Sequence, residues 1–379
     1  MKMVKLGEIA SFSQGQQVSI PDQKTERFDD CDTFLRIVNY TQNSQDFRYI
    51  PKQNKKYHVN VDDIIMVRYG AVGFVGRGLE GVLANNMFKV NYDKENVDGR
   101  FLYRVLWSDS VQKQILNASQ STSMSAINFK TVSKLKLPLP PLDQQKKIVE
   151  ILDTADAYSQ KTQSLLDKYD QLTQSIFLDM FGDPISNPKS WETGSIESAI
   201  KKISKITKDF DKHSIEYIDI SSIDNQRNIV TGTTEYRLDE RPSRAQQILK
   251  AGDILFSTVR PNLKNIAINN LDGAIGSTGF FVFRTGEKLN NRFLFEMLKC
   301  DSMTESFVKI TSGANYPAIK NTDLKKFKII IPPKSIQEEF NNKVHLIQKQ
   351  KNALLQSISK SKNLYDSLLQ KVFKGELTN

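Results

Sequence analysis

Cysteine is scarce in this chain, and long apolar runs are missing from it. Only Cys31 and Cys300 occur among the 379 residues, and they form no CxxC pair, so a disulfide scaffold and a zinc finger are both excluded. The chain contains no run of eighteen apolar residues, and its first residues lack an apolar signal core. We therefore expect a protein without a membrane span, located in the cytoplasm.

Motifs for catalysis, metals and nucleotides are missing as well. His58, His213 and His345 stand in no HExxH or comparable metal-ligand spacing. The glycine run from Gly73 to Gly78 reverses the order of a dinucleotide fingerprint, and no GxxxxGK[ST] phosphate loop occurs. The Asn/Asp-Pro-Pro-Tyr/Phe motif of amino-methyltransferases does not occur either. The sequence therefore predicts a protein that is not an enzyme and that binds neither a metal nor a cofactor.

A long stretch free of glycine and proline follows the double proline Pro140-Pro141 and ends before Gly182. Proline suits the approach to a first helical turn, and glycine suits the residue after a last one. Between these boundaries apolar residues recur at steps of three and four, which predicts one amphipathic helix over residues 142–183. At ~1.5 Å per residue it would be roughly 60 Å long. Asp143 is expected to cap its start.

The same pattern returns 192 residues later, where Pro332-Pro333 and Gln337 match Pro140-Pro141 and Gln145. Residues 334–379 are therefore expected to contain a second long helix, which begins with a capping box from Ser335 to Glu338. We expect the apolar stripes of the two helices to bury each other. The residues predicted to make this helix pairing are Ile148, Leu152, Ala155, Leu166 and Ile176 in the first helix, and Val344, Ile347, Leu354, Ile358 and Leu368 in the second.

The regions before the two helices also repeat. Arg100-Phe-Leu-Tyr103 returns as Arg292-Phe-Leu-Phe295, and Asp62-Asp-Ile-Ile-Met66 resembles Gly252-Asp-Ile-Leu-Phe256. β-rich runs between glycine-marked turns predict strands, and the best local helix is expected at 100–108. The first region should contain strands at 34–38, 63–67 and 86–90.

This duplication predicts the architecture. We expect an α+β fold with a pseudo-two-fold internal repeat: two similar mixed α/β domains separated by two long helices that pair as an antiparallel coiled coil. The predicted segments are a domain at 1–141, a helix at 142–183, a domain at 184–333 and a helix at 334–379.

The net charge of +10 is unevenly distributed. Residues 1–141 hold 19 basic and 14 acidic side chains, and segments 184–333 and 377–379 together hold 22 and 17, so each region carries +5. The first helix has 4 basic against 8 acidic residues (−4), and residues 334–376 have 8 against 4 (+4). The helices complement each other, and basic paired domains suit nucleic acid. On charge alone, a merely basic soluble protein remains the alternative.

Several duplicated motifs resemble a known family. They are LPLPPLDQQKKIVEIL (137–152) and IIIPPKSIQEEF (329–340), the run GDILFSTVRPN (252–262), and the helix endings SIFLDMFGDP (175–184) and SLLQKVFKGEL (367–377). At this fixed spacing they are similar to the specificity subunit of type I restriction-modification systems, over essentially the whole chain. Lys334 and Asn341-Asn342-Lys343 depart from the family pattern by making the entrance of the second helix polar.

The resemblance implies a function. Each domain would be a target-recognition domain that reads one half of a bipartite, asymmetric site on double-stranded DNA. The paired helices would set the spacing and dock two methyltransferase (modification) subunits, and restriction subunits would join the full complex. The chain itself would be non-catalytic, with S-adenosylmethionine, ATP and Mg bound by the partner subunits.

Candidate DNA contacts follow equivalent strands or lie in polar loops. Arginine can make a bidentate contact to guanine and asparagine to adenine, while lysines suit phosphates. For Arg260, beside Pro261, the alternative of a turn-holding role is nearly as strong, and turn roles are also open for the candidates at 85–86 and 277–278. The candidates are Arg68, Tyr69, Asn85, Asn86, Ser121, Ser123, Lys130, Arg260, Asn262, Lys264, Ser277, Thr278, Asn315, Tyr316 and Lys320.

Two rival functions use the same architecture. One is a stand-alone, two-headed DNA-binding protein, and the other is a scaffold whose basic domains bind protein. Co-purification with a methyltransferase would distinguish both from a specificity subunit.

Overall fold

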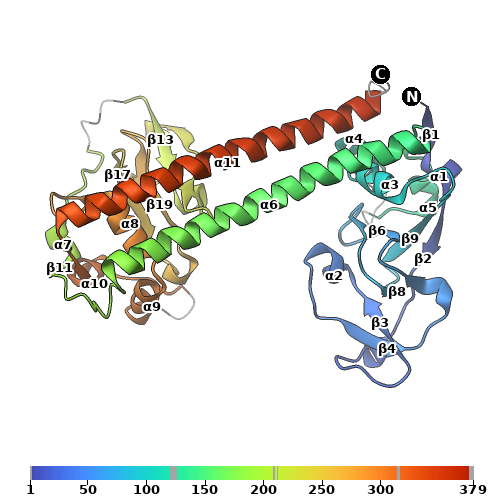
Figure 1. Cartoon of the computed structure of the whole chain (residues 1–379), viewed down its shortest axis with the longest axis horizontal. Helices are drawn as coiled ribbons and strands as arrows, with labels where there is room; N and C mark the ends of the chain where they lie inside the picture. Colours follow the sequence, from blue (N-terminus) through green and yellow to red (C-terminus); the bar gives the residue numbers. More distant parts are fainter. Residues whose placement is uncertain (1, 120–125, 208–209, 211, 314–315, 375–379) are drawn as a thin grey trace. The chain divides into compact units, whose positions relative to one another are not determined.

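The structure is a computed structural model, and it describes residues 2–119, 126–207, 210, 212–313 and 316–374. The chain divides into two compact units, one made of residues 1–162 and 356–379 (unit 1) and one of residues 163–355 (unit 2). Two long helices, α6 (Leu142–Phe181) and α11 (Lys334–Lys374), each contribute one end to each unit (Figure 1). Both predicted long helices are therefore confirmed.

Unit 1 contains two four-stranded sheets and one strand pair. The sheets have the orders β2-β9-β6-β7 and β4-β3-β8-β5, and β1 pairs with β10. Only β3 and β8 pair in parallel among the strand neighbours of these sheets. The strands are β1 (Met3–Lys5), β2 (Ala10–Gln14), β3 (Cys31–Leu35), β4 (Arg48–Pro51), β5 (His58–Val59), β6 (Ile64–Val67), β7 (Val75–Gly76), β8 (Gly81–Leu83), β9 (Met87–Tyr92) and β10 (Lys136–Pro138).

Unit 2 repeats this topology strand for strand. Its sheets are β12-β21-β18-β19 and β16-β13-β20-β17, with β13 and β20 parallel, and β11 pairs with β22. An added hairpin, β14-β15, follows β13. The strands are β11 (Thr193–Ser195), β12 (Ile200–Lys201), β13 (Ser214–Ile218), β14 (Ile223–Asp224), β15 (Ile229–Val230), β16 (Thr234–Arg237), β17 (Ala245–Ile248), β18 (Ile254–Ser257), β19 (Ile266–Ile268), β20 (Ile275–Ser277), β21 (Phe280–Thr285) and β22 (Lys328–Ile330).

Short helices complete each unit. In unit 1 they are α1 (Leu6–Ile9), η1 (Ile20–Asp22), α2 (Ile37–Thr41), η2 (Lys55–Tyr57), α3 (Gly99–Leu106), α4 (Asp109–Ser119) and α5 (Phe129–Val132). In unit 2 they are α7 (Ile196–Ala199), η3 (Ile220–Ser222), η4 (Leu238–Glu240), η5 (Pro261–Leu263), α8 (Asn291–Lys299), α9 (Asp301–Lys309) and α10 (Asn321–Lys326). The predicted α+β fold with an internal repeat is confirmed.

Two local predictions were wrong. The strand predicted at 34–38 ends at Leu35, and α2 begins at Ile37, because Asn39 Oδ1 accepts a hydrogen bond from the Arg36 N–H (2.8 Å) and turns the chain. Asp143 and Ser335 do not precede their helices but lie inside the first turns, because α6 begins at Leu142 and α11 at Lys334.

The two long helices are antiparallel within each unit (Figure 1). In unit 2, Lys351 Nζ lies 2.5 Å from Asp170 Oδ1, and Lys343 Nζ lies 3.9 Å from Met180 Sδ, so rising numbers on α6 meet falling numbers on α11. In unit 1 the hydroxyls of Tyr158 and Ser357 are 2.7 Å apart.

The predicted pairing residues are all buried or half-buried, and their individual contributions to pairing stay predictions. Some of them join the domain cores: Leu152 packs in the core of unit 1, and Val344 in the core of unit 2. The buried members are Ile148, Leu152, Leu166, Val344 and Ile347, and the half-buried ones are Ala155, Ile176, Leu354, Ile358 and Leu368.

A fully buried glutamine fixes the start of each long helix to the preceding domain. Gln145 Nε2 donates to the carbonyls of Asn96 (2.9 Å) and Pro140 (2.8 Å), and its Oε1 accepts from the Asp98 N–H (2.8 Å). Both ends of the carboxamide are therefore used, and they satisfy the buried Pro140 carbonyl and the part-buried Asn96 carbonyl and Asp98 N–H.

Gln337 repeats the arrangement at the same offset. Its Nε2 donates to the carbonyls of Lys288 (2.9 Å) and Pro332 (2.7 Å), and its Oε1 accepts from the Asn290 N–H (2.8 Å). Both glutamines are 0% exposed. The matched glutamines of the sequence repeat are thus one structural device used twice.

We expect Gln145→Leu to lower the free energy of unfolding by about 3 kcal/mol. It removes the partner of the buried Pro140 carbonyl and of the part-buried Asn96 carbonyl and Asp98 N–H, and a group left buried without a partner costs ~1–3 kcal/mol. Urea denaturation followed by circular dichroism measures this. Gln160→Leu, at an exposed position of the same helix, is the control. Equal stability of the two variants would contradict an anchoring role for Gln145.

Candidate nucleic-acid interface

In unit 1, four of the side chains predicted to contact DNA lie where β6 ends and β9 begins: Arg68, Tyr69, Asn85 and Asn86. Arg68 follows β6 directly, but its guanidinium is engaged inside the domain: Nη1 donates to Gln14 Oε1 (3.0 Å), and Nε to the Ile127 carbonyl (3.4 Å). Its N–H also donates to the Asn86 carbonyl (2.8 Å). Arg68 therefore holds three segments together, and a base contact by it stays a prediction.

Asn85 and Tyr69 lie at the mouth of a polar cleft. Asn85 Nδ2 donates to Gln17 Oε1 (3.3 Å), and its Oδ1 accepts from the Tyr69 hydroxyl (3.3 Å). Tyr69 is 41% exposed. The cleft has a volume of about 520 Å³ and is lined by Gln17, Val18, Gln23, Phe34, Arg36, Ile37, Val38, Tyr69, Ala84, Asn85 and Asn86.

Three polar residues of this cleft are absent from the sequence-based candidates. Gln17 and Gln23 add carboxamides, and Arg36 adds a guanidinium whose Nη2 donates to Asp46 Oδ2 (3.0 Å). Carboxamides and guanidinium groups are the side chains that form bidentate contacts to base edges. The glutamine cluster Gln14-Gly-Gln-Gln17 at the end of β2 was the signal available in the sequence.

In unit 2, Arg260 adopts a left-handed backbone conformation (φ 50°) at the start of η5. Its N–H donates to the Pro317 carbonyl (2.8 Å), and its guanidinium lies over the Tyr316 ring, 5.0 Å from the centroid. Positive φ is strained for a side chain such as arginine, so the tertiary contacts hold this turn. The turn and the cation–π pair bring two candidates, Arg260 and the 71% exposed Tyr316, together on the surface.

The remaining candidates differ in accessibility. Lys264 Nζ is tied to Asp301 Oδ1 (2.6 Å) and to the Lys299 carbonyl (3.0 Å), and Ser277 is buried. Four candidates are exposed, and three fall outside the residues that the structure describes. The exposed ones are Lys130, Asn262, Thr278 and Lys320, and those outside are Ser121, Ser123 and Asn315.

The described residues contain no group of three or more His, Cys, Asp and Glu side chains placed to hold a metal ion. Burial and the nearby carboxylates of Asp183 and Glu296 raise the pKa of the Cys300 thiol to about 12, so it stays protonated at neutral pH and is a poor nucleophile. In the part of the chain that the structure covers, no helix combines the length and apolar character needed to cross a bilayer.

Comparison with known families gives one match that covers most of the chain. The family of the type I restriction modification DNA specificity domain matches residues 1–168 and again residues 188–361. The family pattern thus occurs twice, once over each repeat.

Curated relatives are distant in sequence but similar in length. The MjaVIII specificity subunit of a type I restriction enzyme from Methanocaldococcus jannaschii is 22% identical over 397 residues, covering 96% of this chain and 91% of the relative. The EcoDI specificity subunit from Escherichia coli is 21% identical, covering 73% of this chain and 70% of the relative.

Solved structures share the fold. A chain from a type I restriction-modification system aligns over 99% of this chain and 98% of its own length, with a TM-score of 0.59 at 18% identity. The S subunit of the type I system from M. genitalium aligns over 98% and 96%, with a TM-score of 0.55 at 14% identity. With the duplicated fold and the repeated family match, this chain belongs to the family of type I restriction-modification DNA specificity subunits.

Proposed function

We propose that the chain acts as the specificity subunit of a type I restriction-modification complex and reads a bipartite, asymmetric target on double-stranded DNA. The main support for this proposal is the family match, which occurs twice, over two domains that have the same strand order but different surface residues. Two similar readers with different side chains suit two unequal half-sites. The proposed segments are recognition domains at 1–141 and 184–333 and spacer helices at 142–183 and 334–379.

The paired helices would set the spacing between the half-sites and dock two methyltransferase subunits, with restriction subunits joining the full complex. The chain would act in the cytoplasm. No relative described above supports the alternative of a stand-alone DNA-binding or scaffold protein.

The chain would supply recognition but no chemistry. S-adenosylmethionine, ATP and Mg would be bound by the partner subunits. The missing nucleotide and methyltransferase motifs support this assignment.

Within unit 1, the polar cleft beside Asn85 is the proposed base-reading surface. Its carboxamides from Gln17, Gln23 and Asn85 provide donors and acceptors in pairs, as the major-groove edge of adenine requires. Tyr69 adds an exposed aromatic face. In unit 2, the corresponding surface would include the Arg260–Tyr316 pair.

The purified chain, free of partner subunits, should transfer no methyl group to DNA and bind neither S-adenosylmethionine nor ATP. Isothermal titration with each nucleotide ligand and incorporation of labelled methyl groups test this. The same assay with an added methyltransferase subunit is the positive control. Methyl transfer by the chain alone would overturn the proposed function.

Replacing residues 190–331 with the equivalent region of a relative should change one half of the methylated sequence and leave the other half and the spacing intact. The reason is that each unit has its own sheets and core. Sequencing of methylated bases in host DNA gives the result. If both half-sites change together, the domains are not independent readers.

Asn85→Ala should weaken binding of the assembled complex to its target about tenfold or more, since a bidentate base contact contributes ~1–3 kcal/mol of discrimination. Fluorescence anisotropy at fixed salt measures the affinity. Asn117→Ala, at an exposed position on α4, is the matched control and should leave binding unchanged. Unaltered affinity of the Asn85 variant would remove this cleft from the reading surface.

A further inference from the structure

In unit 1, Arg104 of α3 joins the domain to both long helices. Its Nη2 lies 2.9 Å from Asp153 Oδ1, and its Nη1 is paired with Asp156 Oδ2, both on α6. Nη1 also donates to the Tyr365 hydroxyl of α11 (3.1 Å), whose ring centroid lies 5.8 Å from the guanidinium carbon. Burial disfavours the charge, but these acidic partners outweigh it and hold the pKa of Arg104 above its ordinary value.

In unit 2, the residue at the equivalent position, 192 further on, has the opposite charge. Glu296 of α8 has a side chain only 3% exposed, and it faces Arg292 (3.4 Å) and Lys299 (3.2 Å) of its own helix. Its Oε2 accepts a hydrogen bond from Gln174 Nε2 of α6 (2.8 Å). The two junctions between domain and long helix therefore have the same fold, but Arg104 in unit 1 and Glu296 in unit 2 carry opposite charges at the equivalent position.

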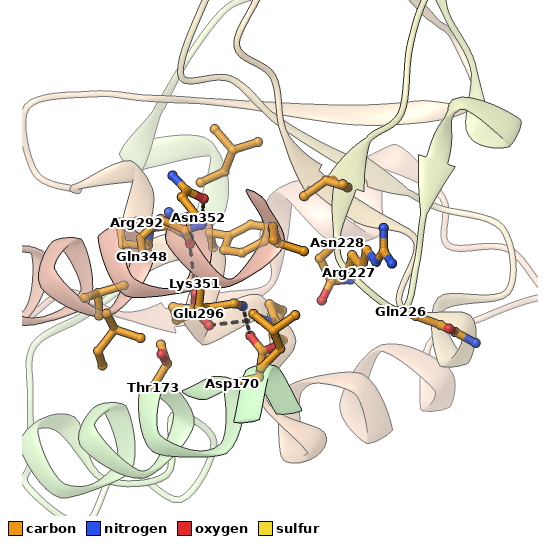
Figure 2. Close-up of a pocket in the computed structure, with 18 of the residues that line it drawn as sticks. Asp170, Thr173, Gln226, Arg227, Asn228, Arg292, Glu296, Gln348, Lys351 and Asn352 are labelled. Atoms are coloured by element: carbon orange, nitrogen blue, oxygen red, sulfur yellow. Dashed lines mark hydrogen bonds and ion pairs between the residues drawn. The ribbon is translucent and has the colours of Figure 1, made fainter. Parts of the chain in front are cut away.

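The junction of unit 2 borders a cleft of about 810 Å³ between α6, α8, α11 and the β14-β15 hairpin. Figure 2 shows Glu296 near Lys351 and Asp170. The ion pair between Lys351 and Asp170 links α11 to α6 beside this cleft. Thr173, which also lines the cleft, occupies the position equivalent to Tyr365 in unit 1.

We propose that these charges select the partner of each half of the chain: an N-terminal half (residues 1–183) accepts a C-terminal half (184–379), whereas two C-terminal halves reject each other. The proposal concerns the pairing of the helices and does not depend on DNA recognition. The partner surface is α6 for a C-terminal half and α11 for an N-terminal half.

The argument follows from the 192-residue equivalence of the two helices. In a pair of two C-terminal halves, Asp366 takes the place of Gln174 and meets the buried Glu296, and Lys362 takes the place of Asp170 and meets Lys351. Both contacts become like-charged. Like charges are unfavourable at both positions. Glu296 is 3% exposed, so little solvent weakens the repulsion there, whereas the Asp170 side chain is 46% exposed, so salt screens the repulsion at position 170.

A pair of two N-terminal halves loses contacts but meets no like charge at these positions. Thr173 takes the place of Tyr365 beside Arg104, and Ser159 takes the place of Lys351 beside Asp170. Arg104 keeps Asp153 and Asp156 of its own half. The local contacts thus favour the mixed pair first, two N-terminal halves second, and two C-terminal halves least.

The intact chain tests this, because two substitutions on α6 can imitate the wrong partner. The double variant Asp170→Lys with Gln174→Asp gives α6 the side chains that α11 carries at the equivalent positions, Lys362 and Asp366. Unit 2 then meets the charges that it would meet in a pair of two C-terminal halves. Asp170→Asn with Gln174→Asn is the neutral control at the same two positions. Urea denaturation of both variants at low salt and at ~1 M salt, where the Debye length is ~3 Å, gives the equilibrium constant for unfolding.

We expect the imitating variant to unfold with a constant at least about tenfold larger than that of the control at low salt, and this ratio should shrink in high salt. Exchanging the charges of the ion pair, Asp170→Lys with Lys351→Asp, should restore most of the stability that Asp170→Lys alone removes. A general packing effect would be insensitive to salt and would not be restored by the exchange. Equal stability of the imitating variant and the control, or a salt-independent difference, would overturn the proposal.

Discussion

The carboxamides of Gln145 and Gln337 are the connection on which the rest of the structure depends. Each binds three backbone groups of the preceding domain and sits in the first turn of a helix of 40 or 41 residues. Because a carboxamide has a donor end and an acceptor end, both must be placed correctly for all three bonds to form. This fixes the direction in which each long helix leaves its domain, while the apolar stripes then determine where the helix packs.

The duplicated backbone carries different side chains at the junctions between the domains and the long helices. Sheet orders, the parallel strand pair and the glutamine anchors are the same in the two units. The surface loops and the junction charges differ, with Arg104 in one unit and Glu296 in the other. Duplication therefore preserves the sheet orders and the glutamine anchors, while the charge at the junction between domain and long helix differs between the two units.

The helices and the repeat could be read from the sequence, because periodicity and a constant offset are local signals. The strand predicted at 63–67 matches β6 to within one residue, whereas residues 37 and 38 were predicted as the end of a strand but begin α2, where Asn39 turns the chain. The binding surface was harder to predict. Arg68 is engaged by Gln14, 54 residues away, and Lys264 by Asp301, and such long-range hydrogen bonds leave no trace in local spacing. Arg36 was missed because the residues that line the cleft with it, such as Tyr69 and Asn85, are distant in the sequence.

The division of the chain into units has a consequence for its synthesis. Unit 2 is one continuous segment, 163–355, whereas unit 1 needs residues 356–379 to join residues 1–162. On the ribosome, the first domain to emerge is therefore the last to acquire all its contacts, since Tyr365 and Leu368 are translated more than two hundred residues after Arg104. Until then, the first turns of α6 keep an uncovered apolar face, and a nascent chain stopped short of residue 356 exposes that face to chaperones and proteases.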